Sequence, residues 1–339
     1  MIIICYLSFY QSTPLTSLMT NTWTELHRPK KLSEIAHQPQ VVQSLETFLK
    51  SNDIPNLLFF GPQGTGKTTA IHAFARELFG DQYRQRIFEI NASSERGVNS
   101  IRTRVKPLSQ LSLSSGIRLI ILEEADALTR DAQAALRRIL EDSAATTRVC
   151  LLCNYASQII APLASRCAKF RFFPLPQSVI SQNLLKIAKL QATQIDEIAA
   201  DQISENARGD MRKAVTDLQM HSLIGRGIVD LQTCRLIEKV QGGVDNQILN
   251  QLFDAIIDKN VAEIEFKEIV NRIFESQISP QELVFALFDK FLNSEEISDR
   301  FRQVCAEQYC KFGVVCAKRG TEKLALSKFL YGVRCACFK

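Results

Sequence analysis

The sequence contains no run of about 20 apolar residues, the length that a membrane-spanning helix needs. It has no Lys or Arg before Arg28, so the apolar start "MIIICYLSFY" lacks the basic segment of a signal peptide. No internal repeat or low-complexity tract is present either. A membrane role is therefore not expected, and residues 1–18 are interpreted as a loose extension before a functional start at Met19.

A disulfide framework is also missing, although the chain has 10 cysteines. Such frameworks belong to small secreted chains, and this chain is long enough to bury a large core. Cys150 and Cys153 form a C-x-x-C, but strand alternation would point them to opposite faces. No second pair follows at zinc-ribbon spacing, so buried cysteines in a reduced, intracellular protein are favoured over a metal site.

Length and charge set further bounds. A chain of 339 residues should divide into two or three domains. Hydrophobic residues make up 46% and charged residues 23%, as in an ordinary globular protein. The net charge of +5 is small, so any nucleic-acid binding must come from a local cluster of Lys and Arg.

Short apolar runs alternate with helical patterns from Asn56 to about Pro174. The runs cover residues 56–60, 87–91, 118–122, 148–154 and 168–173, with helix-like segments such as "KTTAIHAFARELFG" and "RDAQAALRRILED" between them. Strands of this kind joined by helices predict a parallel five-stranded sheet between helices, an α/β fold. After residue 177 the pattern becomes helical, and "QGGVDN" marks a break. We therefore expect a core over 19–176, a helical lid over 177–243 and an all-α domain over 244–339.

The segment "GPQGTGKTT" fits the P-loop pattern G-x-x-x-x-G-K-[ST] directly after a predicted strand and before a predicted helix. Its glycines allow the backbone N–H groups to face a polyphosphate at a helix N-terminus. The Lys contacts the β- and γ-phosphates, and the following Thr hydroxyl is a Mg²⁺ ligand. The expected nucleotide-binding residues are Gly61, Gly64, Gly66, Lys67, Thr68 and Thr69.

Three acids follow the apolar run "LIIL" in the segment "LIILEEADAL". A carboxylate at the end of a strand beside a P-loop can hold Mg²⁺, which is the role expected for Glu123 together with Thr68. Glu124 is placed to activate the attacking water, and Asp126 is interpreted as a helix-entry acid. ATP and Mg²⁺ are the expected cofactors.

These motifs resemble the AAA+ clamp loaders, specifically the small subunits of replication factor C. The resemblance runs from "WTELHRP" through "EINASSERG", "EEADALTRDAQAALRRILE" and "LLCNYASQIIAPLASRCAKFRF" to "GDMRKAVTDLQ". It implies a P-loop AAA+ module, a helical lid and a C-terminal collar for oligomerisation. By matching position it also implies roles for Asn154 (sensor 1), Arg166 (a finger for the neighbouring subunit's ATP), Arg212 (sensor 2) and Arg28 (near adenine and ribose).

The resemblance further implies a heteropentamer of replication factor C subunits that loads the sliding clamp PCNA onto primed DNA, in the nucleus or, for an archaeal chain, the cytoplasm. In "ERGVNSIRTRVKPL", Ile101, Val105 and Leu108 form an apolar face that leaves basic residues outward. The expected DNA-binding residues are Arg96, Arg102, Arg104 and Lys106. Pro107 is expected to kink or shorten this helix.

The chain departs from the family pattern at several positions. Glu123 stands where the family has Asp, His27 replaces a Tyr, His37 a Gly and Ser94 an Asp. Two alternatives therefore stay open beside the ATPase subunit: an ATP-binding scaffold subunit with little hydrolysis, and a stand-alone AAA+ helicase motor.

Overall fold

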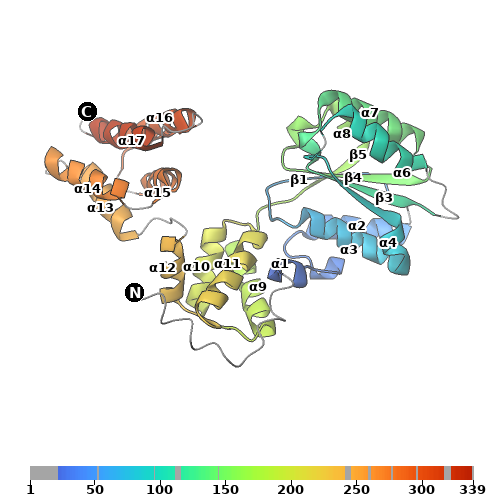
Figure 1. The fold of residues 1–339 in the computed structure, drawn as a ribbon, viewed down its shortest axis with the longest axis horizontal. Helices are drawn as coiled ribbons and strands as arrows, with labels where there is room; N and C mark the ends of the chain where they lie inside the picture. The colour runs from blue at the N-terminus through green and yellow to red at the C-terminus, as the bar shows by residue number, and fades with distance from the viewer. Residues whose placement is uncertain are drawn as a thin grey trace, which may run out of the picture. The chain divides into compact units, whose positions relative to one another are not determined.

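A computed structural model of the chain is drawn in Figure 1. It describes residues 22–51, 53–94, 96–110, 116–143, 145–240, 246–258, 261–275, 278–294, 297–316 and 322–337. The predicted extension over residues 1–18 lies outside these ranges. The chain forms two compact units, residues 1–230 and residues 231–339. Among the helices of the described ranges, none combines the length and apolar character that a membrane crossing needs.

The first unit is built on a parallel sheet with the strand order β2-β3-β4-β1-β5. In chain order the strands are β1 (Asn56–Phe60), β2 (Ile87–Asn91), β3 (Arg118–Glu123), β4 (Thr147–Cys153) and β5 (Cys167–Arg171). They coincide closely with the five apolar runs, because inner strands of a parallel sheet are covered on both faces and need apolar side chains throughout. The predicted α/β sheet is confirmed.

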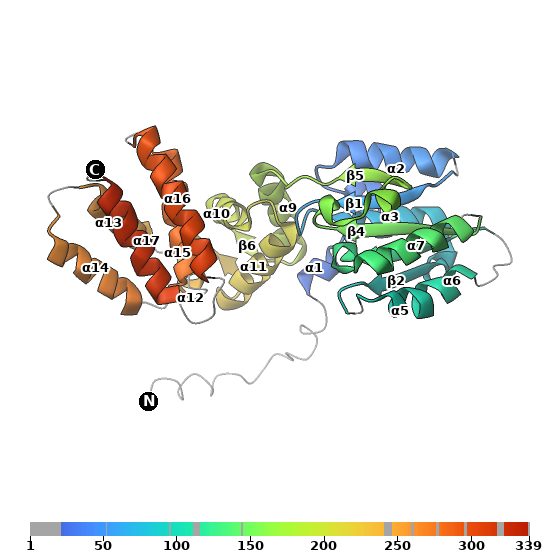
Figure 2. The same ribbon diagram turned by 90° about the horizontal axis from the view of Figure 1, so that it is seen from above.

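Helices cover both faces of this sheet (Figures 1 and 2). One face carries α2 (Pro39–Ser51), α3 (Lys67–Phe79) and α4 (Tyr83–Arg86), and the other carries α5 (Val98–Ser100), α6 (Lys106–Gln110), α7 (Arg130–Asp142) and α8 (Ala161–Ala164). A short helix, α1 (Trp23–Leu26), precedes them. Alternate residues of each strand therefore belong to two separate apolar clusters.

The C-x-x-C cysteines follow this alternation. Cys150 packs in the cluster under α2 and α3, whereas Cys153 packs in the cluster under α7. Both thiols are free and buried. Burial raises the pKa of Cys153 to about 12 and holds that of Cys150 well above its ordinary value. The prediction that these cysteines are buried on opposite faces is confirmed.

The basic segment is helical, but not as a regular α-helix. Between α5 and α6 the residues Ile101–Val105 form one π-helical turn, in which the Lys106 N–H donates to the Ile101 carbonyl five residues earlier. Pro107 follows at once. It has no N–H, and in an α-helix its ring would collide with the Thr103 carbonyl four residues back. The helix is not shortened at Pro107, as the sequence suggested it could be; the turn before Pro107 is widened instead.

A small helical subdomain, called the lid below after the predicted segment, completes the first unit. It consists of α9 (Gln177–Leu190), α10 (Glu197–Ala207) and α11 (Met211–Ile224), with a parallel strand pair, β6 (Gln194–Ile195) and β7 (Ile228–Val229). Periodicity alone predicts only helices here, because strands of two residues leave no alternation to detect.

The second unit is all-α. Its helices are α12 (Leu231–Val240), α13 (Asn246–Ile257), α14 (Glu263–Glu275), α15 (Pro280–Asn293), α16 (Asp299–Cys316) and α17 (Glu322–Cys337). Helices α13 to α17 enclose a core of their own that includes Phe266, Leu287, Phe291 and Leu330. Helix α12 falls in this unit, whereas the expected lid of 177–243 includes it. The division into core, lid and collar at 176 and 243 stays a prediction.

Candidate active site

The P-loop joins the end of β1 to the start of α3, and its glycines are required by the backbone. Gly64 has φ +66°, and a Cβ there would lie 1.7 Å from Oδ1 of Asp210 in the lid. Gly66 has φ +96° and precedes the first residue of α3. Only glycine adopts such angles readily. The predicted Gly-rich phosphate loop therefore has the expected strand–loop–helix context.

Lys67 lies over this loop. Its Nζ donates to the carbonyls of Gly61 and Pro62, both at 2.7 Å, and to Oδ1 of Asn154 at 3.2 Å. Burial lowers the pKa of Lys67 from its ordinary value, and several neighbouring acids oppose the shift. The ammonium group thus connects the P-loop to the end of β4. In this partly buried place its positive charge would attract an anionic ligand strongly.

Thr68 and Glu123 meet at the start of α3. The Thr68 hydroxyl lies 3.2 Å from Oε1 of Glu123. Both atoms are hard oxygen donors of the kind that Mg²⁺ prefers. No group of three or more His, Cys, Asp or Glu in the described ranges could hold a metal ion unaided. The pair therefore fits a Mg²⁺ whose other ligands are water and phosphate oxygens, as is usual for this ion.

Glu124 stands at the turn after β3 and is exposed to solvent. Its backbone is left-handed, with φ 52° and ψ 43°. A non-glycine residue in this region carries a conformational cost, and such residues are common at functional sites. Glu124 lines the same pocket as Lys67 and Thr68.

Asp126 has a contact that the sequence did not indicate. Its Oδ2 accepts hydrogen bonds from the backbone N–H groups of Asn154, at 3.0 Å, and Tyr155, at 3.3 Å. It lies in a short 3₁₀ turn, Ala125–Ala127, so the predicted helix-entry position is only part of its role. The carboxylate joins the turn after β3 to the end of β4 and holds the backbone from which the Asn154 side chain extends.

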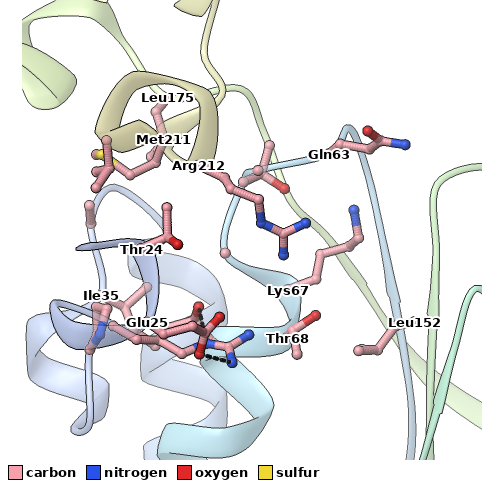
Figure 3. Close-up of a pocket in the computed structure, with 18 of the residues that line it drawn as sticks. Thr24, Glu25, Ile35, Gln63, Lys67, Thr68, Leu152, Leu175, Met211 and Arg212 are labelled. Carbon is pink, nitrogen blue, oxygen red and sulfur yellow. Dashed lines mark hydrogen bonds and ion pairs between the residues drawn. The ribbon is translucent and has the colours of Figure 1, made fainter. Parts of the chain in front are cut away.

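These groups line one pocket of about 510 Å³ (Figure 3). The lid contributes Met211 and Arg212, and Figure 3 shows the Arg212 guanidinium directed towards Lys67. The Met211 N–H donates to the Gly64 carbonyl at 3.2 Å, so the lid touches the P-loop directly. The pocket combines cations, oxygen donors and apolar walls, which suits a nucleoside polyphosphate.

The N-terminal helix closes another side of the pocket. Arg28 donates to Oγ1 of Thr69 at 3.4 Å and pairs with Glu25 at 3.1 Å. His27 lies 2.8 Å from the Gln191 amide, through its Nε2, and burial lowers the pKa of the imidazole. His27 therefore links the N-terminal segment to the lid, a contact that spacing in the sequence could not reveal.

The remaining predicted residues lie outside this pocket. Arg166 follows α8, donates to the Pro162 carbonyl at 2.9 Å and forms an ion pair with Glu141. Four basic residues are exposed along the segment that packs beside α7: Arg96, Arg102, Arg104 and Lys106. The Arg96 carbonyl accepts from the Thr129 N–H at the start of α7, so this segment is tied to the helix that follows the acids.

Comparison with known proteins is consistent with this geometry. Residues 57–175 match the family model "ATPase family associated with various cellular activities (AAA)". Among solved structures, the Thermotoga maritima RuvB Holliday junction branch migration motor aligns with a TM-score of 0.54 and 19% identity, over 68% of this chain and 79% of that one. At this identity the likeness shows the fold alone.

Curated relatives are closer in sequence. Human replication factor C subunit 4 is 37% identical over 316 residues, covering 90% of this chain and 85% of that protein. The replication factor C small subunit of Staphylothermus marinus is 39% identical over 282 residues, covering 79% and 86%. Subunit 2 of Schizosaccharomyces pombe is 42% identical over 252 residues, covering 72% and 74%. The chain therefore belongs to the replication factor C small subunits, AAA ATPases that act as subunits of an ATP-dependent clamp loader.

Proposed function

We propose that the pocket binds ATP with Mg²⁺ and hydrolyses it when the subunit is assembled. The observation that carries this proposal is the convergence of Lys67, the Thr68–Glu123 pair and Asn154 at one end of the sheet. Lys67 would neutralise the β- and γ-phosphates, and Arg212 would contact the same ligand from the lid. Thr68 and Glu123 would hold Mg²⁺, which when bound would offset charge on the phosphates.

The hydrolytic step would use Glu124 and Asn154. Glu124 is exposed to the pocket at the turn after β3, where its carboxylate can orient the attacking water and accept its proton. Asn154 would position that water near the γ-phosphate. Arg166 does not line this pocket, which is compatible with a role at the ATP of a neighbouring subunit.

We also propose the partners of the complex. The subunit would join other replication factor C subunits in a heteropentamer, with residues 244–339 as the collar. The assembled ring would open PCNA and place it on primed DNA, in the nucleus of a eukaryote or the cytoplasm of an archaeon. Arg96, Arg102, Arg104 and Lys106 would contact DNA phosphates, which requires charge but no base-specific geometry.

Replacing Glu124 by Gln tests the enzymatic part. The amide keeps the shape of the side chain but cannot accept a proton, so DNA-stimulated phosphate release by the complex should fall by at least about 100-fold while ATP still binds. Asp142→Asn, which also neutralises an exposed carboxylate, should leave the rate unchanged. Unaltered turnover in Glu124→Gln would favour the scaffold alternative. A hexamer of the isolated chain in light scattering would favour the helicase motor.

The double variant Arg102→Ala/Arg104→Ala tests the DNA contacts. Loss of two phosphate contacts should lower the salt dependence of binding to primed DNA by about 2 in log–log slope. Lys50→Ala/Arg84→Ala is a matched control, because it removes two exposed charges from helices on the opposite face of the sheet. Equal affinity and slope in all three proteins would contradict the DNA assignment.

A further inference from the structure

We infer that the π turn Ile101–Val105 is a positioning element that holds Arg102 and Arg104 on one exposed arc, where both guanidinium groups can reach phosphates of a nucleic-acid backbone. The inference rests on the proposed DNA-binding role of this segment. It adds that the π turn determines how the two arginines are arranged. The sequence pattern does not predict this π turn.

The exposure pattern of the turn is the first observation. Ile101 and Val105 are 1% and 0% exposed and belong to the core under α7, whereas Arg102, Thr103 and Arg104 between them are all exposed. Two buried anchors thus enclose an arc of three exposed residues, two of which are arginines.

The width of the turn determines how far those arginines lie from the core. In an α-helix successive side chains are about 100° apart around the axis, so the angle between residues four positions apart is greater than a full circle. In a π turn each residue covers a smaller angle, and four positions fall short of a full circle. Because Ile101 and Val105 stay fixed in the core, the wider turn moves Arg102 and Arg104 further from the core, on opposite sides of the helix axis.

Both ends of the turn are held in place, which prevents it from relaxing by rotation. On the far side of Pro107, the Thr147 hydroxyl donates to the Ser109 carbonyl at 3.3 Å, and the Arg118 guanidinium donates to the Leu108 carbonyl. Thr147 and Arg118 are 2% and 1% exposed. Before the turn, the Arg96 carbonyl accepts from the Thr129 N–H at the start of α7. The segment is therefore fixed to α7 before the π turn and to the sheet after it, so the wider spacing must be accommodated within the turn.

Pro107 explains why the α-helical alternative is disfavoured. In an α-helix residue 107 would donate to the Thr103 carbonyl, a bond that proline cannot make and a position with which its ring collides. The hydrogen bond that is formed instead runs from Lys106 to Ile101, across five residues. Proline thus stabilises the turn that spreads the two arginines.

Deletion of Thr103 tests the inference. It is combined with Pro107→Ala, which removes the ring that would collide with the carbonyl four residues earlier. The shortened turn then lets the bond from Lys106 to Ile101 span four residues as in an α-helix, and both anchored ends keep their contacts. In the complex assembled with its partner subunits, primed-DNA affinity should fall by about tenfold and the salt slope by about 1. Thr103→Ala is the matched control: it keeps the length and loses only the hydroxyl bond to the Asn99 carbonyl.

The outcomes separate this inference from the proposed function. Normal affinity and slope after the deletion overturn the inference, as does an equal loss in Thr103→Ala. If Arg102→Ala/Arg104→Ala also binds normally, the DNA assignment itself is wrong; if that variant is weakened and the deletion is not, only the positioning role is wrong. Unchanged ATP affinity shows that the deleted protein is folded.

Pro107→Ala decides the matter if the shortened chain does not assemble. The variant keeps the chain length and permits the α-helical bond to Thr103. A weakening of DNA binding by at least about threefold supports the inference, and unchanged binding overturns it. Pro280→Ala is its control, because Pro280 occupies the first turn of α15, where no preceding carbonyl is disturbed.

Discussion

At the scale of single residues, Glu123 is the acid for which the resemblance to the family predicts Asp. Its longer side chain still reaches Thr68, with 3.2 Å between the hydroxyl and Oε1. We predict that Glu123→Gln raises the Mg²⁺ concentration for half-maximal ATP hydrolysis by roughly 10–100-fold, the range seen when a carboxylate near a metal is lost.

The measurement is a Mg²⁺ titration of steady-state hydrolysis. Glu89→Gln is a suitable control, because Glu89 lies on the neighbouring strand β2 and its pKa is raised by burial and by the Glu123 charge. An equal Mg²⁺ requirement in both variants would remove Glu123 from the proposed metal site.

His72 gives a prediction about pH. The side chain lies on the buried face of α3, the helix that follows the P-loop, with its Nδ1 2.7 Å from the Tyr83 hydroxyl. Burial, with Arg28 and Arg76 nearby, lowers the pKa of His72 from 6.5 to about 4. Between these values the unfolded chain binds more protons than the folded one, so the free energy of unfolding keeps its full value above about pH 6.5 and falls towards pH 4.

His72→Gln should remove this dependence, which is worth on the order of 3 kcal/mol over the whole interval. Urea unfolding of the two proteins at pH 7.5 and pH 5 measures it. The difference in stability between them should be constant above neutrality and should shift in favour of the variant at pH 5. Parallel stability curves at both pH values would contradict the low pKa.

At the scale of elements, the Asp126 carboxylate joins the turn after β3 to the end of β4. We predict that Asp126→Ala lowers the rate of ATP hydrolysis by about 10–100-fold with little change in ATP affinity, because Asn154 is displaced by a fraction of an ångström from the reacting phosphate. Asp126→Asn, which retains one acceptor oxygen for the Asn154 and Tyr155 N–H groups, should recover part of the rate.

Single-turnover hydrolysis and nucleotide binding, measured separately, distinguish this from a general loss of structure. A variant that loses ATP affinity and hydrolysis in parallel would show that Asp126 supports the fold of the pocket and not the position of Asn154.

The same contact shows what the sequence could and could not predict. The strands, the P-loop and helix α7 follow local rules of apolar periodicity, glycine and capping, so their residues could be located closely. Lys67 and Thr68 follow from a local motif. The pairing of Asp126 with Asn154, and of Met211 with Gly64, joins residues far apart in the chain and depends on strand order and lid position, which no local pattern contains.

The basic helix illustrates an intermediate case. The sequence correctly placed Ile101 and Val105 on an apolar face, and it identified Pro107 as a disturbance. It did not specify how the disturbance would be resolved, because a kink, an early end and a widened turn all remove the same clash. Packing on both sides of the proline decides among them.

At the scale of the whole molecule, the two units have separate proposed functions, ATP binding in the first and oligomerisation in the second. Every residue that lines the ATP pocket lies between Trp23 and Val215, within the first unit, and the second unit has an apolar core of its own. We predict that a chain ending at Asp230 still binds ATP, with an affinity within about threefold of the full chain, because no pocket contact is removed.

The shortened chain should nevertheless fail to join the other subunits, since the second unit is the proposed collar. Equilibrium binding of a fluorescent ATP analogue measures the first property, and light scattering after mixing with the partner subunits measures the second. Lys67→Ala in the full chain is the reciprocal control: it should assemble but bind ATP poorly, because the ammonium group that contacts the P-loop carbonyls and Asn154 is lost. A shortened chain that assembles normally would assign oligomerisation to the first unit, and one that is folded but cannot bind ATP would mean that the pocket depends on residues beyond 230.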